Sequence, residues 1–252
     1  MADLMRQMTE QTTSRIERLA DLAAAGGLDE AITMIADSIA NDGVLQAFGT
    51  GHSQAFAMEI AGRAGGLIPT ARVSLSDLVV VGGQDRSVLS SGSELERDPS
   101  VVDDLWALTD AAPADVFLIA SNSGVNGSIV GFALKAKEHG HGVIAVTSLE
   151  HTSRVTPKHP SGKRLSEIAD VVIDNLAPYG DATLTVGDGI GVGAVSSMTA
   201  AFIAQLLTIG ATERLASSGG TPPVYLSANI PGGDEHNHAL EDRYGDRLRR
   251  HA

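Results

Sequence analysis

Residues 44–53 read VLQAFGTGHS, an apolar stretch followed at once by a glycine-rich turn. Val44–Phe48 has the length and composition of a buried strand, and Gly49–Ser53 is too polar and too rich in glycine to continue it. Gln54–Ala64 then has a helical pattern that ends at Gly65–Gly66. Strand, turn and helix in this order are typical of one βα unit of a parallel sheet.

The same pattern recurs along the chain. Asp115–Ala120 (DVFLIA) predicts a second strand, and Ser128–His139 predicts the helix that follows it. Gly142–Val146 (GVIAV) and Ala169–Ile173 (ADVVI) predict a third and a fourth strand. Short apolar strands between helices are typical of a parallel sheet covered on both faces. We therefore expect an α/β fold with a doubly wound, flavodoxin-like sheet over residues 42–252.

The first 41 residues predict two helices instead. One apolar stripe contains Leu4, Met8, Ile16, Leu19 and Leu22. Gly26–Gly27 end this helix, and Asp29 is placed to cap a second helix that ends at Asn41–Gly43. We expect residues 1–41 to form an N-terminal helical extension that joins copies of the chain into a homodimer or a larger homo-oligomer.

Charge and composition restrict the partners. The chain has 31 acidic and 18 basic residues, a net charge of −13, which argues against a nucleic-acid surface because such surfaces are basic. There are no cysteines, which excludes thiolate chemistry.

The N-terminus has no apolar signal region, so we expect a cytoplasmic protein. Gly189–Thr212 is free of charge for 24 residues but contains several hydroxyl side chains, and we interpret it as a buried core helix without membrane contact.

Polar residues follow three of the predicted strands. These are Thr50, Gly51, His52 and Ser53 after the first, Ser121, Asn122 and Ser123 after the second, and Thr147 and Ser148 after the third. Hydroxyls and free N–H groups at helix N-termini hold phosphate without lysine. The alternative for each single loop is a helix cap. The first loop lacks the lysine of a P-loop, and Gln54 replaces the third glycine of the dinucleotide fingerprint, so we expect neither nucleotide site.

These strand ends, FGTGHS, LIASNSG and IAVTS, resemble those of the SIS (sugar isomerase) domain, a family that binds phosphosugars. The stretches VTSLEHTSRV, HPSGKRLSEIADVVIDN and PPVYLSANIPGGDE also resemble one bacterial group of SIS-domain proteins. Relatives in the wider family include phosphoheptose isomerase, N-acetylmuramic acid 6-phosphate etherase and transcription regulators without catalysis. The resemblance implies that Ser53, the pair Ser121 and Ser123, and the pair Thr147 and Ser148 bind the phosphate.

The resemblance implies that Glu59, on the helix after the first loop, acts as a base, because several SIS enzymes use a glutamate on the same helix in this way. A carboxylate there can remove the C2 proton of an open-chain sugar phosphate. An ion pair with Arg63, four residues on, would oppose this use of Glu59. His52, His151 and His236 are candidate proton donors. His236 and His238 follow two carboxylates, but their spacing is weak evidence for a metal, and the proposed chemistry needs no metal and no cofactor.

Two candidate reactions begin with this removal of the C2 proton, and a third candidate function, sensing of the sugar, needs no reaction. We expect a lyase that removes water from C3 of an N-acetylhexosamine 6-phosphate such as N-acetylglucosamine 6-phosphate, a preference that rests on the etherase relatives. The alternatives are an aldose–ketose phosphosugar isomerase and a non-catalytic phosphosugar sensor. A neighbouring subunit would complete a shared active site, as in similar SIS proteins. Residues 74–98, polar and with Gly82–Gly83 and Ser90–Ser93, predict a long loop, and long loops in compact domains are often lids.

Overall fold

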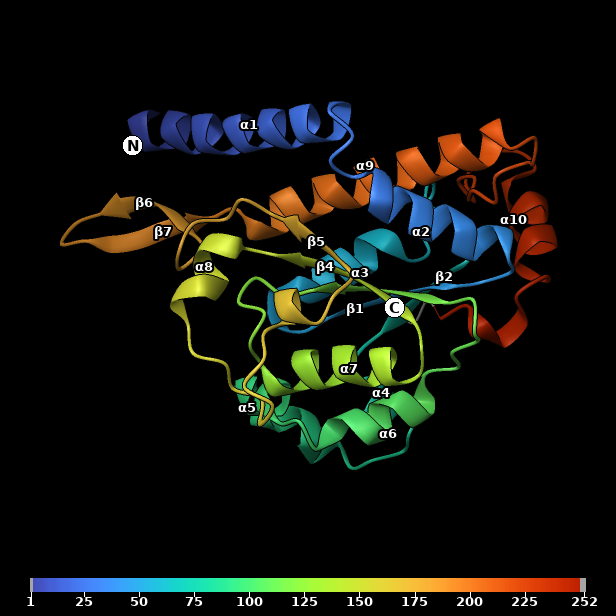
Figure 1. Ribbon diagram of the computed structural model, residues 1–252. Helices are drawn as coiled ribbons and strands as arrows, with labels where there is room; N and C mark the ends of the chain where they lie inside the picture. Colours follow the sequence, from blue (N-terminus) through green and yellow to red (C-terminus); the bar gives the residue numbers. More distant parts are fainter. Residues whose placement is uncertain (1, 250–252) are drawn as a thin grey trace.

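The computed structural model describes residues 2–249 and contains a five-stranded parallel sheet (Figure 1). The strand order is β2-β1-β3-β4-β5, which is the flavodoxin-like order that the sequence predicts. The strands are β1 (Leu45–Gly49), β2 (Thr70–Val73), β3 (Val116–Ala120), β4 (Gly142–Thr147) and β5 (Val171–Asp174), and a separate antiparallel pair is formed by β6 (Ala182–Val186) and β7 (Ile190–Ala194).

Helices cover both faces of the sheet. The α-helices are α1 (Ala2–Ala24), α2 (Asp29–Ala40), α3 (Gln54–Ile60), α4 (Asp77–Val80), α5 (Ser93–Arg97), α6 (Val101–Leu108), α7 (Gly127–Glu138), α8 (Leu149–Arg154), α9 (Ser196–Ser217) and α10 (Gly233–Glu241). Short 3₁₀ turns are η1 (Gly51–Ser53), η2 (Arg86–Ser91), η3 (Leu165–Glu167) and η4 (Gly245–Arg247). In Figure 1, α2 and α9 lie above the sheet, and α4, α6 and α7 lie below it.

The strands are apolar because each face of the sheet packs on helices. Leu45 and Ala47 of β1 belong to a core cluster with α2, α3 and α9. Phe48 of β1 belongs to the opposite cluster, with α4, α6 and α7. Every residue of β1 and β3 is buried, which explains why their sequences show continuous rather than alternating hydrophobicity.

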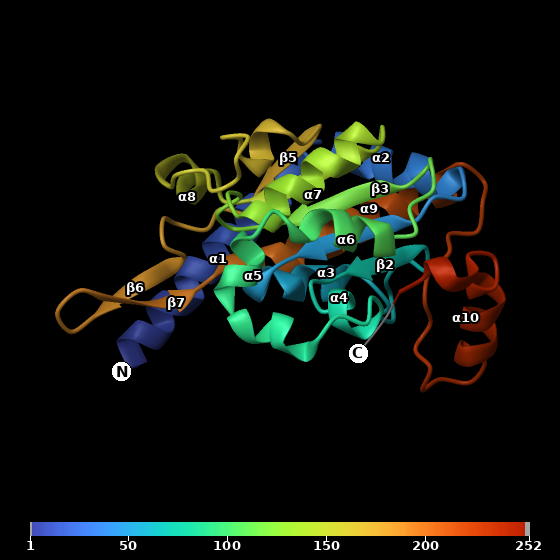
Figure 2. The same ribbon diagram turned by 90° about the horizontal axis from the view of Figure 1, so that it is seen from below.

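The N-terminal helices are confirmed, and they share the core of the sheet domain. Leu19 of α1 and Ile35 of α2 are buried in the same cluster as β1. Asp29 is the first helical residue, and Leu28 occupies the cap position predicted for Asp29. Figures 1 and 2 show α1 lying along α9 and the β6–β7 hairpin. The division of the chain at residue 41 and the oligomeric role of these helices stay predictions.

The predicted core helix over Gly189–Thr212 begins later than expected. Residues 190–194 form β7, and α9 begins at Ser196, because Gly189 and Gly193 have φ of +92° and +76°, which a helix does not accept. Eight residues of α9 are buried against α2, α3 and the sheet. In residues 2–249, none of the helices is long and apolar enough to cross a membrane. Likewise α3 ends at Ile60, four residues before the predicted end.

Candidate functional site

A cleft opens at the carboxyl ends of the strands, between β1 and β3. The sheet order reverses here, because β2 lies on one side of β1 and β3 on the other, and ligands of open α/β sheets bind at such a point. Its volume is about 350 Å³, within the range of small-molecule sites. Its lining residues are Thr50, Gly51, His52, Ser53, Glu96, Ser121, Asn122, Ser123, Asn126, His151, Asp181, Ala194, Ser196 and Ser197.

Two glycines fold the loop after β1. A Cβ on Gly49 would lie 2.3 Å from the carbonyl oxygen of Ser53, so only glycine fits. Gly51 has φ +56°, a conformation that favours glycine. The tight turn brings Thr50 and His52 to the cleft together with Gly51 and Ser53. The 3₁₀ turn η1 thereby lies at the edge of the cleft, directly before α3.

The loop after β3 adds two hydroxyls and two amides to the same cleft. Ser121 Oγ accepts a hydrogen bond from the Gly124 N–H at 3.1 Å, so its own hydrogen can be donated to a ligand. Asn122 Oδ1 accepts from Asn175 Nδ2 at 3.1 Å. Among the described residues, Asn126 Oδ1 is buried without a hydrogen-bond partner. A hydroxyl of a bound ligand would satisfy this acceptor.

The loop after β4 differs from the sequence-based interpretation, because Thr147 and Ser148 are completely buried behind the cleft. Ser148 Oγ donates to the Ala177 carbonyl at 2.6 Å and accepts from the His151 N–H at 3.0 Å. Ser148 is thus the cap of α8, the alternative that applies to any single strand-end serine. Thr147 lies with its hydroxyl 3.4 Å from the Asn122 carbonyl. Both residues support the cleft from behind instead of lining it.

Sequence reasoning missed two carboxylates that line the cleft. Glu96 lies on α5, within the predicted lid, and its Oε2 is 3.1 Å from the position of a Cβ built on Gly51. Ser128 Oγ donates to the Glu96 carbonyl at 2.7 Å and ties α5 to α7. The acidic residues of the stretch SELERD, residues 93–98, were the feature of the sequence that could have indicated Glu96. Residues 74–98, called the lid segment below, are not one long loop but contain α4, η2 and α5; their closing over a ligand stays a prediction.

Asp181 is the second carboxylate, and it is already paired. It accepts hydrogen bonds from the N–H groups of Val195 and Ser196, at 3.1 and 2.8 Å, and from Ser196 Oγ at 2.6 Å. The N-terminus of α9 thus compensates its charge. Ser196 and Ser197 line the cleft beside it. Asp181 has φ +65°, and its triple hydrogen bonding holds this strained backbone in place.

His151 lies in the cleft with a defined ring orientation. Its Nδ1 accepts a hydrogen bond from the Gly180 N–H at 3.0 Å, so Nε2 carries the proton of the neutral imidazole. Burial lowers the pKa of His151, although Asp181 opposes the shift. The ring also lies against Tyr179, with centroids 5.3 Å apart. His151 is therefore a neutral hydrogen-bond donor near pH 7.

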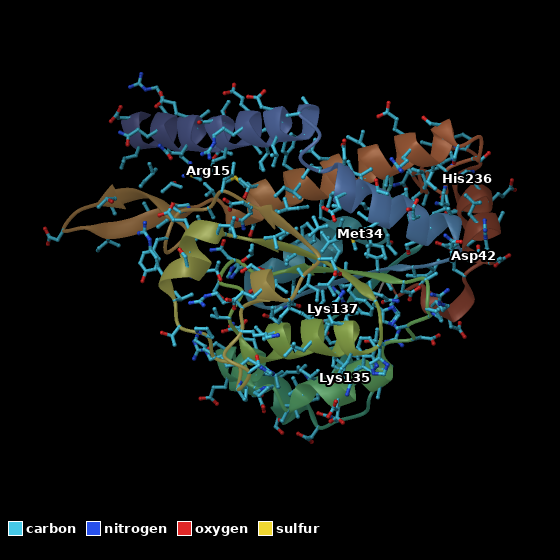
Figure 3. The ribbon with its side chains drawn as sticks, viewed as in Figure 1. Arg15, Met34, Asp42, Lys135, Lys137 and His236 are labelled. Carbon is cyan, nitrogen blue, oxygen red and sulfur yellow. The ribbon has the colours of Figure 1, made fainter. Side chains whose placement is uncertain are left out.

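His236 lies far from the cleft in this chain. It belongs to α10, at the opposite end of the molecule from α8 (Figures 1 and 3). Its Nε2 is 2.9 Å from the Val224 carbonyl oxygen. Within residues 2–249, no cluster of three or more His, Asp and Glu side chains is arranged to hold a metal ion.

Glu59 is also outside the lining of the cleft. Its carboxylate forms an ion pair with Arg63, the pairing that the sequence indicated, and accepts from Gln205 Nε2 of α9 at 2.6 Å. The side chain of Glu59 is 22 % exposed. Because α3 packs on α9, the turn that carries Glu59 faces α9 rather than the strand ends. The structure thus separates Glu59 from the loops around Ser53 and Ser121.

Comparisons with known proteins agree with this architecture. The family model of the SIS domain matches residues 10–148. The chain is also 38 % identical over 247 residues to a UPF0309 protein of Listeria monocytogenes, covering 98 % of this chain and 96 % of that protein. The chain belongs to the SIS-domain family and to the UPF0309 proteins.

Solved structures share the fold of this SIS-domain protein at low sequence identity. A phosphoheptose isomerase from Francisella tularensis is similar with a TM-score of 0.55 and 15 % identity, over 84 % of this chain and 98 % of that one. A putative phosphosugar isomerase involved in capsule formation from Bacteroides fragilis is similar with a TM-score of 0.54 and 16 % identity, over 98 % of both chains.

Proposed function

We propose that the cleft binds a phosphorylated sugar and that the protein is a phosphosugar lyase. The observation that carries the proposal is the convergence of Thr50–Ser53 and Ser121–Ser123 with Glu96 and His151 around one space of about 350 Å³. Hydroxyls and backbone N–H groups are suited to phosphate. The carboxylate and the imidazole are suited to proton transfer at the sugar. SIS-domain membership and the names of the similar isomerases support the same substrate class.

We assign the base to Glu96 instead of Glu59. Glu96 lines the same space as the phosphate-binding loops, whereas Glu59 is engaged by Arg63 and Gln205 outside it. A general base must be within hydrogen-bond reach of the proton that it removes. Glu96, Ser53 and Ser121 line one space, so the proposal places the phosphate at the two serines and C2 of the sugar at Glu96.

The proposed reaction is loss of water from an N-acetylhexosamine 6-phosphate in its open-chain form. Glu96 takes the C2 proton, the electron pair forms a double bond between C2 and C3, and the C3–O bond breaks. The oxygen leaves as water, with the proton that Glu96 holds, while His151 Nε2–H donates a hydrogen bond to that oxygen. No cofactor and no metal enters this balance. The N-acetyl group and the C3 leaving group follow from the etherase resemblance.

An aldose–ketose isomerase is the second candidate, because it needs the same carboxylate and phosphate loops. In that reaction, on an aldose phosphate with a hydroxyl at C2, Glu96 moves the C2 proton to C1, the proton of the C2 hydroxyl passes to O1, and C3 keeps its hydroxyl. The similar structures that are named isomerases favour this alternative. A homodimer or larger homo-oligomer with a shared site, to which a partner's histidine contributes, stays part of the proposal.

Proton NMR of the protein with N-acetylglucosamine 6-phosphate in heavy water tests the proposal. We expect loss of the C2 proton signal and new vinylic signals. A parallel sample with an aldose 6-phosphate that has a hydroxyl at C2 tests the isomerase, because only such a sugar can become a ketose; loss of its C2 proton signal with a ketose product would establish that reaction. Stabilisation by the ligand without exchange at C2 would indicate a sensor and contradict both enzymes.

Three glutamate variants test the assignment of the base. Glu96→Gln should lower turnover by about 10²–10⁴-fold and keep ligand binding, since the amide cannot accept the proton. Glu94→Gln, at an exposed position on the same helix, is the matched control and should keep wild-type turnover. If the Glu96→Gln variant has normal turnover and the Glu59→Gln variant is inactive, the base is Glu59 and the assignment to Glu96 is wrong.

A further inference from the structure

The N-terminal helix contacts the segment that supports the floor of the cleft. In α1, the guanidinium of Arg15 points to the chain after β5 and donates from Nε to the Leu176 carbonyl at 2.9 Å (Figure 3). Its Nη1 donates to both the carbonyl and the side-chain oxygen of Gln11, at 2.8 and 2.7 Å. Gln11 thus fixes the guanidinium on α1, and the Nε–H is aimed at one carbonyl group, 161 residues away in the sequence.

Leu176 has an unusual backbone conformation. Its φ is +59°, in the left-handed region that is unfavourable for a residue with a Cβ. Its N–H donates to Asp174 Oδ1 at 3.0 Å, and its carbonyl accepts from Arg15. Such a conformation persists only when surrounding contacts hold it. Arg15 supplies one of those contacts, so it helps to determine the path of the chain at 174–177.

The neighbouring residue lies beside the cleft. Asn175 is 3 % exposed and lines a small pocket that shares Ser121 and Asn122 with the cleft. Its Nδ2 donates to Asn122 Oδ1 at 3.1 Å, its Oδ1 accepts from the Ala177 N–H at 3.0 Å, and its own N–H donates to the Thr147 carbonyl at 2.9 Å. A rotation of the peptide at Leu176 would therefore move the amide that orients Asn122.

We infer that Arg15 is a positioning residue for the ligand cleft: through the Leu176 carbonyl it fixes Asn175, and through Asn175 it orients Asn122 in the loop after β3. The inference deepens the proposed function and rests on it for the identity of the ligand. It gives α1 a role within its own chain, in addition to the oligomeric role expected from its sequence. Arg15 touches no ligand in this assignment and acts only through the cleft floor.

The test compares two matched arginine replacements in the full chain. Arg15→Met keeps much of the apolar stem and removes the donor. Arg18→Met makes the same replacement at an exposed position on α1. Arg15→Lys keeps a cationic donor and is the conservative variant. The first measurement uses no ligand: hydrogen exchange of residues 174–177, and the NMR signals of the Asn122 and Asn175 side-chain amides. The second is the Kd for N-acetylglucosamine 6-phosphate by calorimetry.

For Arg15→Met we expect faster exchange at 174–177, shifted amide signals of Asn122 and Asn175, and a Kd raised by about tenfold. Arg15→Lys should recover part of the affinity, and Arg18→Met should match the wild type in every measurement. Unchanged amide signals in Arg15→Met, or equal effects of Arg18→Met, would overturn the inference. If the wild type does not bind the phosphosugar, the proposed function fails, and the exchange and amide signals still decide the role of Arg15.

Discussion

Replacing Gly127 by alanine should release the lid segment from α7. A Cβ at this position would lie 2.2 Å from the Arg97 carbonyl oxygen and 2.9 Å from Pro99 Cδ, so the backbone after α5 must move by about 1 Å to reach ordinary contact. Overpacking of this kind costs roughly 1–3 kcal/mol, whereas alanine in place of glycine gains at most about 1 kcal/mol in a helix. The displacement also stretches the 2.7 Å hydrogen bond from Ser128 Oγ to the Glu96 carbonyl, worth about 1 kcal/mol.

The expected result is a loss of about 1–3 kcal/mol, which for a chain of this length lowers Tm by about 2–12 °C. Hydrogen exchange should become faster in residues 93–98 through local opening, whereas exchange in β1 and β3 should accelerate only by the factor that the lower global stability gives. Turnover should fall because Glu96 is displaced, whereas phosphate affinity should change little. Gly220→Ala is the control, since the nearest atom to its Cβ is 3.8 Å away. A Gly127→Ala protein with wild-type Tm, exchange and turnover would refute this account of the lid.

Three more predictions concern the phosphate loop, pH and the fold. Ser121→Ala combined with Ser123→Ala should raise the Kd for the phosphosugar at least about 100-fold, since each hydrogen bond to a charged group contributes about 1.5–3 kcal/mol. An unchanged Kd in calorimetry would show that this loop does not bind the phosphate. Burial lowers the pKa of His151 in the folded state, so the unfolded chain binds the proton first and stability falls as pH drops below about 6.5. His151→Gln should reduce the slope of Tm against pH in that range, and an identical slope would contradict the assignment. In Arg247→Met the completely buried Asp115 loses its cationic partner, so the free energy of unfolding in urea should fall by about 3 kcal/mol. A fall of less than about 1 kcal/mol would show that hydrogen bonds from backbone N–H groups are enough to stabilise the Asp115 carboxylate.

The sheet could be predicted from the sequence because its strands are buried on both faces. Val116–Ala120 and Gly142–Thr147 are short apolar runs that pack on helices in both directions, the pattern of strands in a parallel sheet covered on both faces. Thr70–Val73 was missed because it is an edge strand of four residues that contains Thr70 and Arg72. The hairpin over 182–194 was missed although Ala182–Val186 alternates apolar residues with threonines and Gly187–Gly189 follows as a turn, because the uncharged run 189–212 was interpreted as one helix.

The candidate site could be predicted only in part. The loops at Ser53 and Ser121 follow strands, so the fold alone brings them together. Glu96 reaches the cleft through a tertiary contact of α5 with α7, about 45 residues from Ser53 in sequence, and no periodicity encodes such a contact. Ser148 shows the opposite error: a hydroxyl at the correct strand end is used as a helix cap.

The described residues that line the cleft include no lysine and no arginine. A phosphate there would be held by neutral dipoles, and neutral dipoles attract few counterions. Because Glu96 and Asp181 also line the cleft, salt should screen their repulsion of a phosphate and should not weaken binding, unlike binding at a basic patch, where each ion pair formed releases bound salt. The separation of phosphate binding from proton transfer also has an evolutionary consequence. In the proposed function the phosphate is bound by main chain and small side chains at the strand ends, whereas the proposed base comes from residues 74–98, so exchange of that segment would change the reaction while the ligand class is retained.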